Sequence, residues 1–191
     1  TLLFRFGFDA TVNGEPLITM RDGCAGFFSA AELAAGKGVV RTAIQEKPTA
    51  GKVTGGFTRP VAMRKESLDE TKLAALRDGN YSKAFDWSFD ALPIHQPKKL
   101  PGNMLRLVHR IPTLEPDGGR WGLGRIIGEA DIHPDDWFLT CHFVDDMVMP
   151  GTLMYECCMH TLRVFLMRMG WVGEEDAIAC EPVPGIKSRL K

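Results

Sequence analysis

A histidine and a glutamate fourteen positions apart are the residues whose types and spacing could do chemistry in this chain. His142 lies in a segment without regular periodicity, and Glu156 falls on the second turn of a helix predicted to begin at Pro150-Gly151. An imidazole can act as a base near physiological pH, and burial raises the pKa of a carboxyl group so that it can act as a general acid. The backbone N–H of Gly151, at the positive end of the helix dipole, can hold a developing oxyanion. Together these groups could remove a proton α to a carbonyl and expel a β-hydroxyl group as water.

Each of these residues also has a purely structural interpretation. His142 could be a hydrogen-bonded packing residue, and the Pro-Gly pair could simply start the helix. Glu156 could pair with His160 or Arg163, which follow it at i+4 and i+7. The residues alone therefore leave the catalytic and the structural interpretation open.

A metal-dependent hydrolase is another alternative, because the surrounding loop is rich in residue types that bind metals. No recognised ligand spacing is present, and adjacent acidic residues are usually solvated. The residues concerned are His133, Asp135, Asp136, His142, Asp145 and Asp146.

Composition excludes several classes of protein. The 191 residues include 23 Lys and Arg against 24 Asp and Glu, so no basic surface for nucleic acid is expected. Apolar residues make up 45% and charged residues 25%, which is typical of a folded globular chain. No apolar run approaches the ~18 residues that a membrane span needs, and no secretory signal pattern is present. Five cysteines without a C-x-x-C pair favour a cytoplasmic location over a disulfide framework.

The elements that must position the candidate pair centre on one apolar helix, predicted over 150–169 and ended by Gly170. Between Thr152 and Met169 its only charged residues are Glu156, Arg163 and Arg168, so protein should surround it. Strands are predicted over 104–111 and 123–132 around a turn at 117–119, and a strand-like run follows at 183–190. This order indicates a sheet wrapped around a central helix.

The remaining sequence divides into a hairpin and a stretch rich in Pro and Gly. Apolar residues alternate from Phe4 to Val12, and Asn13-Gly14 is a strong hairpin signal, so residues 1–28 are predicted as a half-buried hairpin. Residues 41–100 read as a connector with one helix. Ser67 and Glu70 form a predicted capping box for that helix, and Gly79 ends it.

The run from Cys141 to Glu156 resembles the active-site segment of the β-hydroxyacyl-acyl-carrier-protein dehydratases, including the β-hydroxydecanoyl dehydratase/isomerase branch. That segment has Cys-His-Phe, an acidic loop, Val-Met-Pro-Gly and an acid fourteen positions after the histidine, as here. The longer run 133–171 is similar to the dehydratase domains of polyunsaturated fatty acid synthases. The resemblance implies an α+β hot-dog fold, in which an antiparallel sheet wraps around a long helix.

The same resemblance implies a domain organisation. Residues 1–40 would be the C-terminal hairpin of a preceding hot-dog unit, 41–100 the connector, and 101–191 the N-terminal part of a catalytic unit. The hot-dog fold is then partial in this chain. We expect the chain to be a piece of a longer polypeptide, with at least one strand after residue 191.

By this resemblance, His142 is the catalytic base, Glu156 is the acid, and Gly151 donates its amide to the thioester oxygen. The reaction is dehydration of a β-hydroxyacyl thioester to the trans-2-enoyl thioester, without a cofactor because only protons move. The isomerising branch usually has Asp where this chain has Glu156, so dehydration is expected more firmly than isomerisation. Four apolar residues could line an acyl tunnel or belong to the core: Phe138, Phe143, Val148 and Met154.

The implied partners are an acyl carrier protein with its phosphopantetheine-linked substrate and a second hot-dog unit. In the family, the histidine and the acid of one active site come from two units, so a twin or a neighbouring dehydratase domain should complete the site. Two alternatives stay open on the same fold. One is a non-catalytic unit that packs against an active one, and the other is a thioesterase.

Overall fold

The computed structural model describes residues 1–38, 40–53 and 55–172. The chain divides into two compact units, one over Thr1–Gln45 and one from Glu46 onward. The strand-like run predicted at 183–190 lies outside the described residues. No helix within the described ranges combines the length and the apolar character that crossing a membrane requires.

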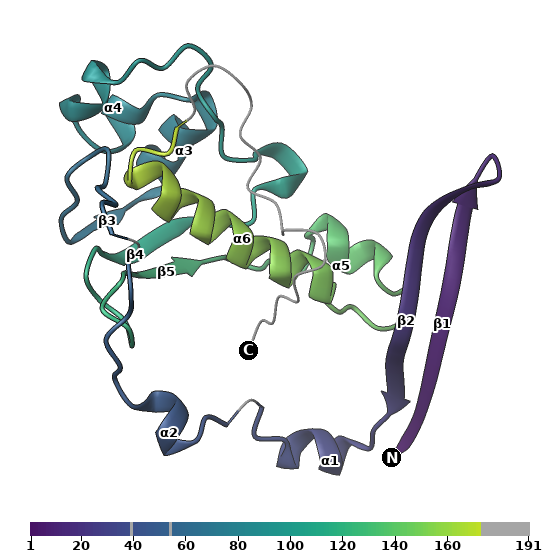
Figure 1. Ribbon diagram of the computed structural model, residues 1–191. Helices are drawn as coiled ribbons and strands as arrows, with labels where there is room; N and C mark the ends of the chain where they lie inside the picture. Colours follow the sequence, from purple (N-terminus) through teal and green to yellow (C-terminus); the bar gives the residue numbers. More distant parts are fainter. Residues whose placement is uncertain (39, 54, 173–191) are drawn as a thin grey trace. The chain divides into compact units, whose positions relative to one another are not determined.

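The first unit is the predicted hairpin, formed by β1 (Leu2–Val12) and β2 (Glu15–Phe27) in antiparallel register (Figure 1). Asn13 and Gly14 have φ values of 51° and 85°, which suits the tight turn that the sequence predicted. Two short helices follow, α1 (Ala30–Ala35) and α2 (Ala43–Glu46).

The apolar side chains of the hairpin are not buried within the described residues. Phe4, Phe6 and Phe8 on β1 are exposed, as are Leu17 and Ile18 on β2. The predicted alternation is present, but the half-buried face is not, because two strands alone offer no second layer to pack against.

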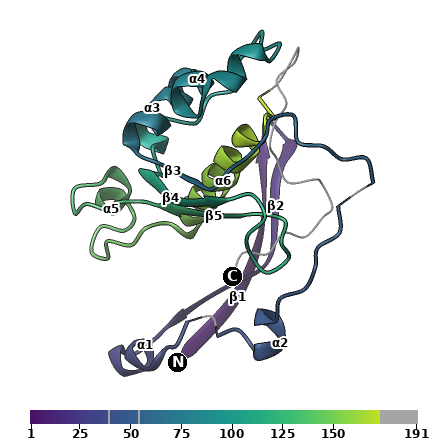
Figure 2. The ribbon, with the colours of Figure 1, turned by 90° about the vertical axis from the view of Figure 1, so that its left-hand side faces the viewer.

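The second unit is built on a three-stranded antiparallel sheet in the order β3-β4-β5, with α6 across it (Figures 1 and 2). The strands are β3 (Glu66–Leu68), β4 (Arg110–Glu115) and β5 (Arg125–Glu129). The predicted strand over 104–111 was wrong at its start, because η2 (Asn103–Leu105) is a 3₁₀ turn. The segment 133–149 contains a short helix, α5 (Trp137–Cys141).

Helix α6 (Gly151–Arg168) confirms the predicted helix. It contacts β5, and Gly128 of that strand lies against Thr161 of the helix. A side chain at Gly128 would collide with the Thr161 hydroxyl, which donates to the Cys157 carbonyl at 2.8 Å. Only glycine therefore allows this helix to lie on this strand.

Segments from the predicted connector share one hydrophobic core with α6. They include α3 (Glu70–Asp78), α4 (Tyr81–Ala84) and η1 (Trp87–Ala91). The structure differs here from a linker, because apolar residues on both sides of residue 100 are buried against each other. The buried members of this core include Leu68, Leu73, Leu76, Phe85, Phe89, Ile111, Leu114, Val164 and Phe165.

The start of α3 corrects one local prediction. Asp69, rather than Ser67, caps the helix, and its carboxylate accepts the Lys72 N–H at 3.0 Å. Ser67 belongs to β3, so no Ser67–Glu70 capping box forms. Gly79 ends the helix as predicted, with a left-handed φ of 80°.

The last residue of α6 is a buried arginine. The Arg168 side chain is fully buried and forms an ion pair with Glu66 through Nε. Its Nη1 donates to the Ala62 carbonyl at 3.0 Å, and its Nη2 lies 3.7 Å from Asp86 Oδ2. The guanidinium also stacks near the Phe85 ring. One charged group thus joins α6 to the segment that precedes β4.

Candidate functional site

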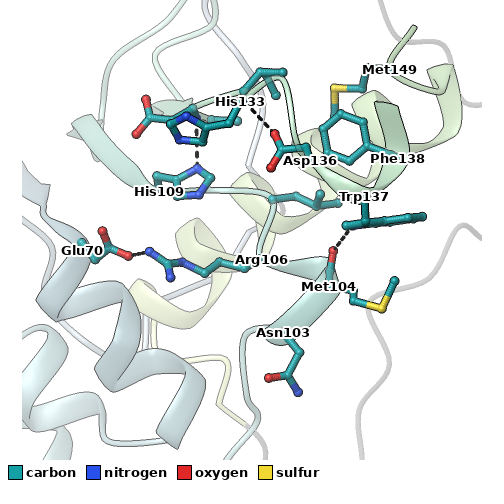
Figure 3. Close-up of a pocket in the computed structure, with 14 residues that line it drawn as sticks. Glu70, Asn103, Met104, Arg106, His109, His133, Asp136, Trp137, Phe138 and Met149 are labelled. Atoms are coloured by element: carbon teal, nitrogen blue, oxygen red, sulfur yellow. Dashed lines mark hydrogen bonds and ion pairs between the residues drawn. The ribbon is translucent and has the colours of Figure 1, made fainter. Parts of the chain in front are cut away.

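A cavity of about 380 Å³ opens where η2, the segment before β4 and the loop after β5 meet α5 (Figure 3). Leu107 and Phe138, both buried, are among its apolar wall residues. Several charged and titratable side chains also line it, namely Glu70, Arg106, His109, Asp131, His133 and Asp136.

Most of the polar groups around this cavity bind each other. Arg106 forms an ion pair with Glu70, and Asp131 accepts from Arg110 at 2.8 Å. The Trp137 indole N–H donates to the Met104 carbonyl at 3.0 Å (Figure 3). The cavity walls are therefore braced by internal contacts.

His109 holds a central place in this wall. Its Nδ1 accepts the Asp131 backbone N–H at 3.0 Å, which leaves the ring proton on Nε2 when the imidazole is neutral. Burial lowers the pKa of His109, and the Arg106 charge lowers it further, against an opposing effect from Asp131. The ring is thus neutral near pH 7.

Among the seven predicted site residues, Phe138 alone lines this cavity. His142 follows α5 directly, is partly exposed, and its Nδ1 lies 2.9 Å from the Val148 carbonyl oxygen. Phe143, Val148 and Met154 are exposed, so within the described chain they form neither a tunnel nor a core.

Glu156 makes the intrahelical contacts that the sequence offered as its structural interpretation. Its Oε1 lies 2.9 Å from His160 Nε2 and 3.9 Å from Arg163 Nη1. The side chain is 34% exposed, so the expected deep burial is not found. His160 is buried, and this burial lowers its pKa against the opposing effect of the Glu156 carboxylate.

Gly151 is the first residue of α6, with Pro150 at the N-cap. The space around it is open, since a side-chain carbon added at Gly151 would meet no atom within 4 Å. The amide therefore lies at an accessible helix N-terminus, where the dipole favours negative charge.

The described residues contain no cluster of three or more His, Cys, Asp or Glu side chains that could hold a metal ion. The acidic loop considered for a metal hydrolase is not folded into a ligand set. Asp136 instead accepts the His133 backbone N–H at 2.7 Å.

Sequence reasoning missed the part of the wall formed by His109, Arg106 and Glu70. Glu70 comes from α3, and Arg106 and His109 come from the segment before β4. In the sequence-based prediction these segments belong to different parts of the chain, the connector over 41–100 and the unit over 101–191. No local motif marks them, because only the pairing of β4 with β5 brings His109 to Asp131.

Comparison with known proteins adds two findings. Residues 100–186 match the family model of a FabA-like domain. The chain is also 36% identical, over 193 aligned residues, to a protein from Thraustochytrium sp. that is named as a component of a polyunsaturated fatty acid synthase. The match covers 99% of this chain and 13% of that relative, so the chain spans a small part of the relative's length.

Proposed function

From the premise that this chain belongs to the FabA-like, hot-dog dehydratase family through residues 100–186, we propose that it dehydrates β-hydroxyacyl thioesters during fatty acid synthesis. The predicted resemblance and the hot-dog fold class are both confirmed by the match. One observation carries the proposal. Within the matched residues, His142 directly follows α5, and Gly151 and Glu156 lie on the first turns of the next helix.

The proposed reaction moves two protons and releases one water. His142 removes the proton from C2 of the β-hydroxyacyl thioester, and the Gly151 amide stabilises the negative charge on the thioester oxygen. Glu156, protonated, gives its proton to the β-hydroxyl, which leaves as water as the double bond forms between C2 and C3. A general acid or base contributes ~10²–10⁴ in rate, and an oxyanion donor about 10²–10³.

We further propose that a second hot-dog unit completes the site. The contacts of His142 and Glu156 described above do not join the two side chains to each other. The segment between them carries exposed apolar side chains, with Phe143, Val144 and Met147 at 57%, 89% and 64% exposure. An exposed apolar patch of this kind is typical of an interaction surface. A second copy or a neighbouring dehydratase domain would cover it.

The substrate would be carried by an acyl carrier protein on a phosphopantetheine arm, in the cytoplasm. Phe138, Phe143, Val148 and Met154 would line the acyl tunnel only once the second unit is in place. The carboxyl group at 156 is that of Glu, so we propose dehydration without double-bond isomerisation.

The test is hydration of a crotonyl thioester by the intact protein that contains this chain. His142→Ala and Glu156→Gln should each lower turnover by about 10²–10⁴. His95→Ala and Glu46→Gln change an exposed histidine and an exposed glutamate and should retain wild-type turnover. Wild-type turnover in both candidate variants would show the assignment to be incorrect.

The contacts of Glu156 favour one second candidate, a non-catalytic unit that packs against an active one. Its carboxylate already contacts His160 and Arg163. In that case the two substitutions would leave turnover unchanged while weakening association with the partner unit. Product analysis separates a thioesterase, which would release free acid in place of the enoyl thioester.

A further inference from the structure

Helix α5, which ends immediately before His142, is connected to the sheet by the loop after β5. His109 holds the start of this loop through two contacts. Its backbone N–H donates to the Glu129 carbonyl at 2.8 Å. Its ring Nδ1 accepts the Asp131 N–H at 3.0 Å (Figure 3). The imidazole thus extends the pairing of β4 with β5 by one residue beyond the strands.

The loop is held at its other end as well. Asp136 accepts the His133 backbone N–H at 2.7 Å, and the Trp137 indole donates to the Met104 carbonyl at 3.0 Å. The first turn of α5 is therefore fixed between the His109–Asp131 contact and the Trp137–Met104 contact. His142 is the residue that immediately follows this short helix.

We propose that His109 is a positioning residue for the candidate base. Its neutral imidazole accepts the Asp131 amide and so fixes the loop that orients α5 and His142. This inference rests on the proposed function, in which His142 takes the proton. The contact needs a neutral ring, because Nδ1 of an imidazolium ion is a donor and cannot accept an N–H.

The charges around His109 favour that neutral form. Positive groups reach it from its own segment and from α3, and burial acts in the same direction. Asp131 opposes them from the loop, but it is itself bound to Arg110. Among the described residues, the charged or titratable groups that act on the ring or line the same cavity come from four places. They are Arg77 and Glu70 from α3, Arg106 and Arg110 beside the ring, Glu129 from β5, and Asp131, His133 and Asp136 from the loop.

Two substitutions separate positioning from packing. His109→Asn keeps an acceptor near the place of Nδ1 but cannot titrate, whereas His109→Leu keeps apolar volume and removes the acceptor. In the intact protein, His109→Leu should lower kcat for hydration of a crotonyl thioester by about tenfold or more, because small displacements of a reacting group are costly. KM should change little. His109→Asn should restore kcat to within about threefold of wild type.

The pH profile provides a readout that a packing role would not move. Protonation of His109 should depress wild-type kcat on the acid side, and His109→Asn should extend activity to lower pH. His95→Leu, a change at an exposed histidine, should leave the profile unchanged. Wild-type kcat in His109→Leu, or an Asn variant as impaired as the Leu variant, would overturn the proposal.

Hydrogen exchange makes the inference independent of the chemistry. His109→Leu should speed exchange at the Asp131 amide and through α5, and His109→Asn should not. If His142→Ala keeps activity while this exchange pattern appears, the proposed function fails. The inference that the His109–Asp131 contact fixes the loop would still hold. If exchange is unchanged in His109→Leu, the His109–Asp131 contact does not fix the loop.

Discussion

The two halves of α6 differ in what they contact. In the C-terminal half, Val164 and Met167 are buried in the core and Arg168 is fully enclosed. In the N-terminal half, Gly151 and Met154 are exposed and Glu156 is one-third exposed. One continuous helix therefore attaches to the fold at one end and presents its candidate chemistry at the other. Changes in the first half should affect stability, and changes in the second half should affect reactivity.

The largest contrast is expected between two arginines of this helix. Arg168→Ala should cost about 3–5 kcal/mol of folding stability, because it leaves the buried Glu66 carboxylate without its partner. Arg163→Ala removes a partly exposed side chain 3.9 Å from Glu156 and should cost about 1 kcal/mol or less. Urea unfolding followed by tryptophan fluorescence measures both values. Equal losses would contradict the division of the helix.

Two methionines test the same contrast without charge. Met167→Ala creates a cavity in the core and should cost about 2–5 kcal/mol. Met154 is 50% exposed, so Met154→Ala should stay within about 0.5 kcal/mol of wild type in the same unfolding experiment. A large loss for Met154→Ala would show that the N-terminal half is packed within the chain after all.

The smallest effect is a pH dependence at the midpoint of α6. Burial lowers the pKa of His160 below the ordinary value of 6.5, so the unfolded chain binds more protons than the folded one. Its contribution to stability is complete above pH 6.5 and is lost as pH falls toward the folded-state value. A difference of one pH unit between the pKa values of His160 in the folded and the unfolded chain corresponds to about 1.4 kcal/mol of unfolding free energy. His160→Asn should flatten the acid side of a plot of unfolding free energy against pH, and His95→Asn should not. An unaltered slope in His160→Asn would contradict the assignment.

Local signals predicted those parts of the fold that depend on few neighbours. The Asn13-Gly14 turn, the helix after Pro150 and the stop at Gly79 follow from backbone preferences of single residues. The start of β4 and the cap of α3 did not follow from local signals. The pairing of β3 with β4 keeps Ser67 extended and leaves Asp69 as the helix cap. The shared core around residue 100 also depends on contacts between distant segments.

The candidate site divides in the same way. His142, Gly151 and Glu156 were found because they lie within fifteen residues of one another in a motif-like run. The hydrogen bond between the His109 ring and the Asp131 amide joins residues 22 positions apart and depends on the register of β4 against β5. A histidine at the end of a predicted strand carries no local signal that its ring will accept an amide from the next strand's loop.

The buried arginine at the end of α6 determines where this unit can be cut. The family model begins at residue 100, but the carboxylates around Arg168 belong to Glu66 and Asp86. A fragment trimmed to the matched residues would expose the guanidinium and the apolar side chains that pack against residues before 100 to water. Recombinant versions of this unit should therefore begin ahead of residue 60, so that the arginine retains its counterions.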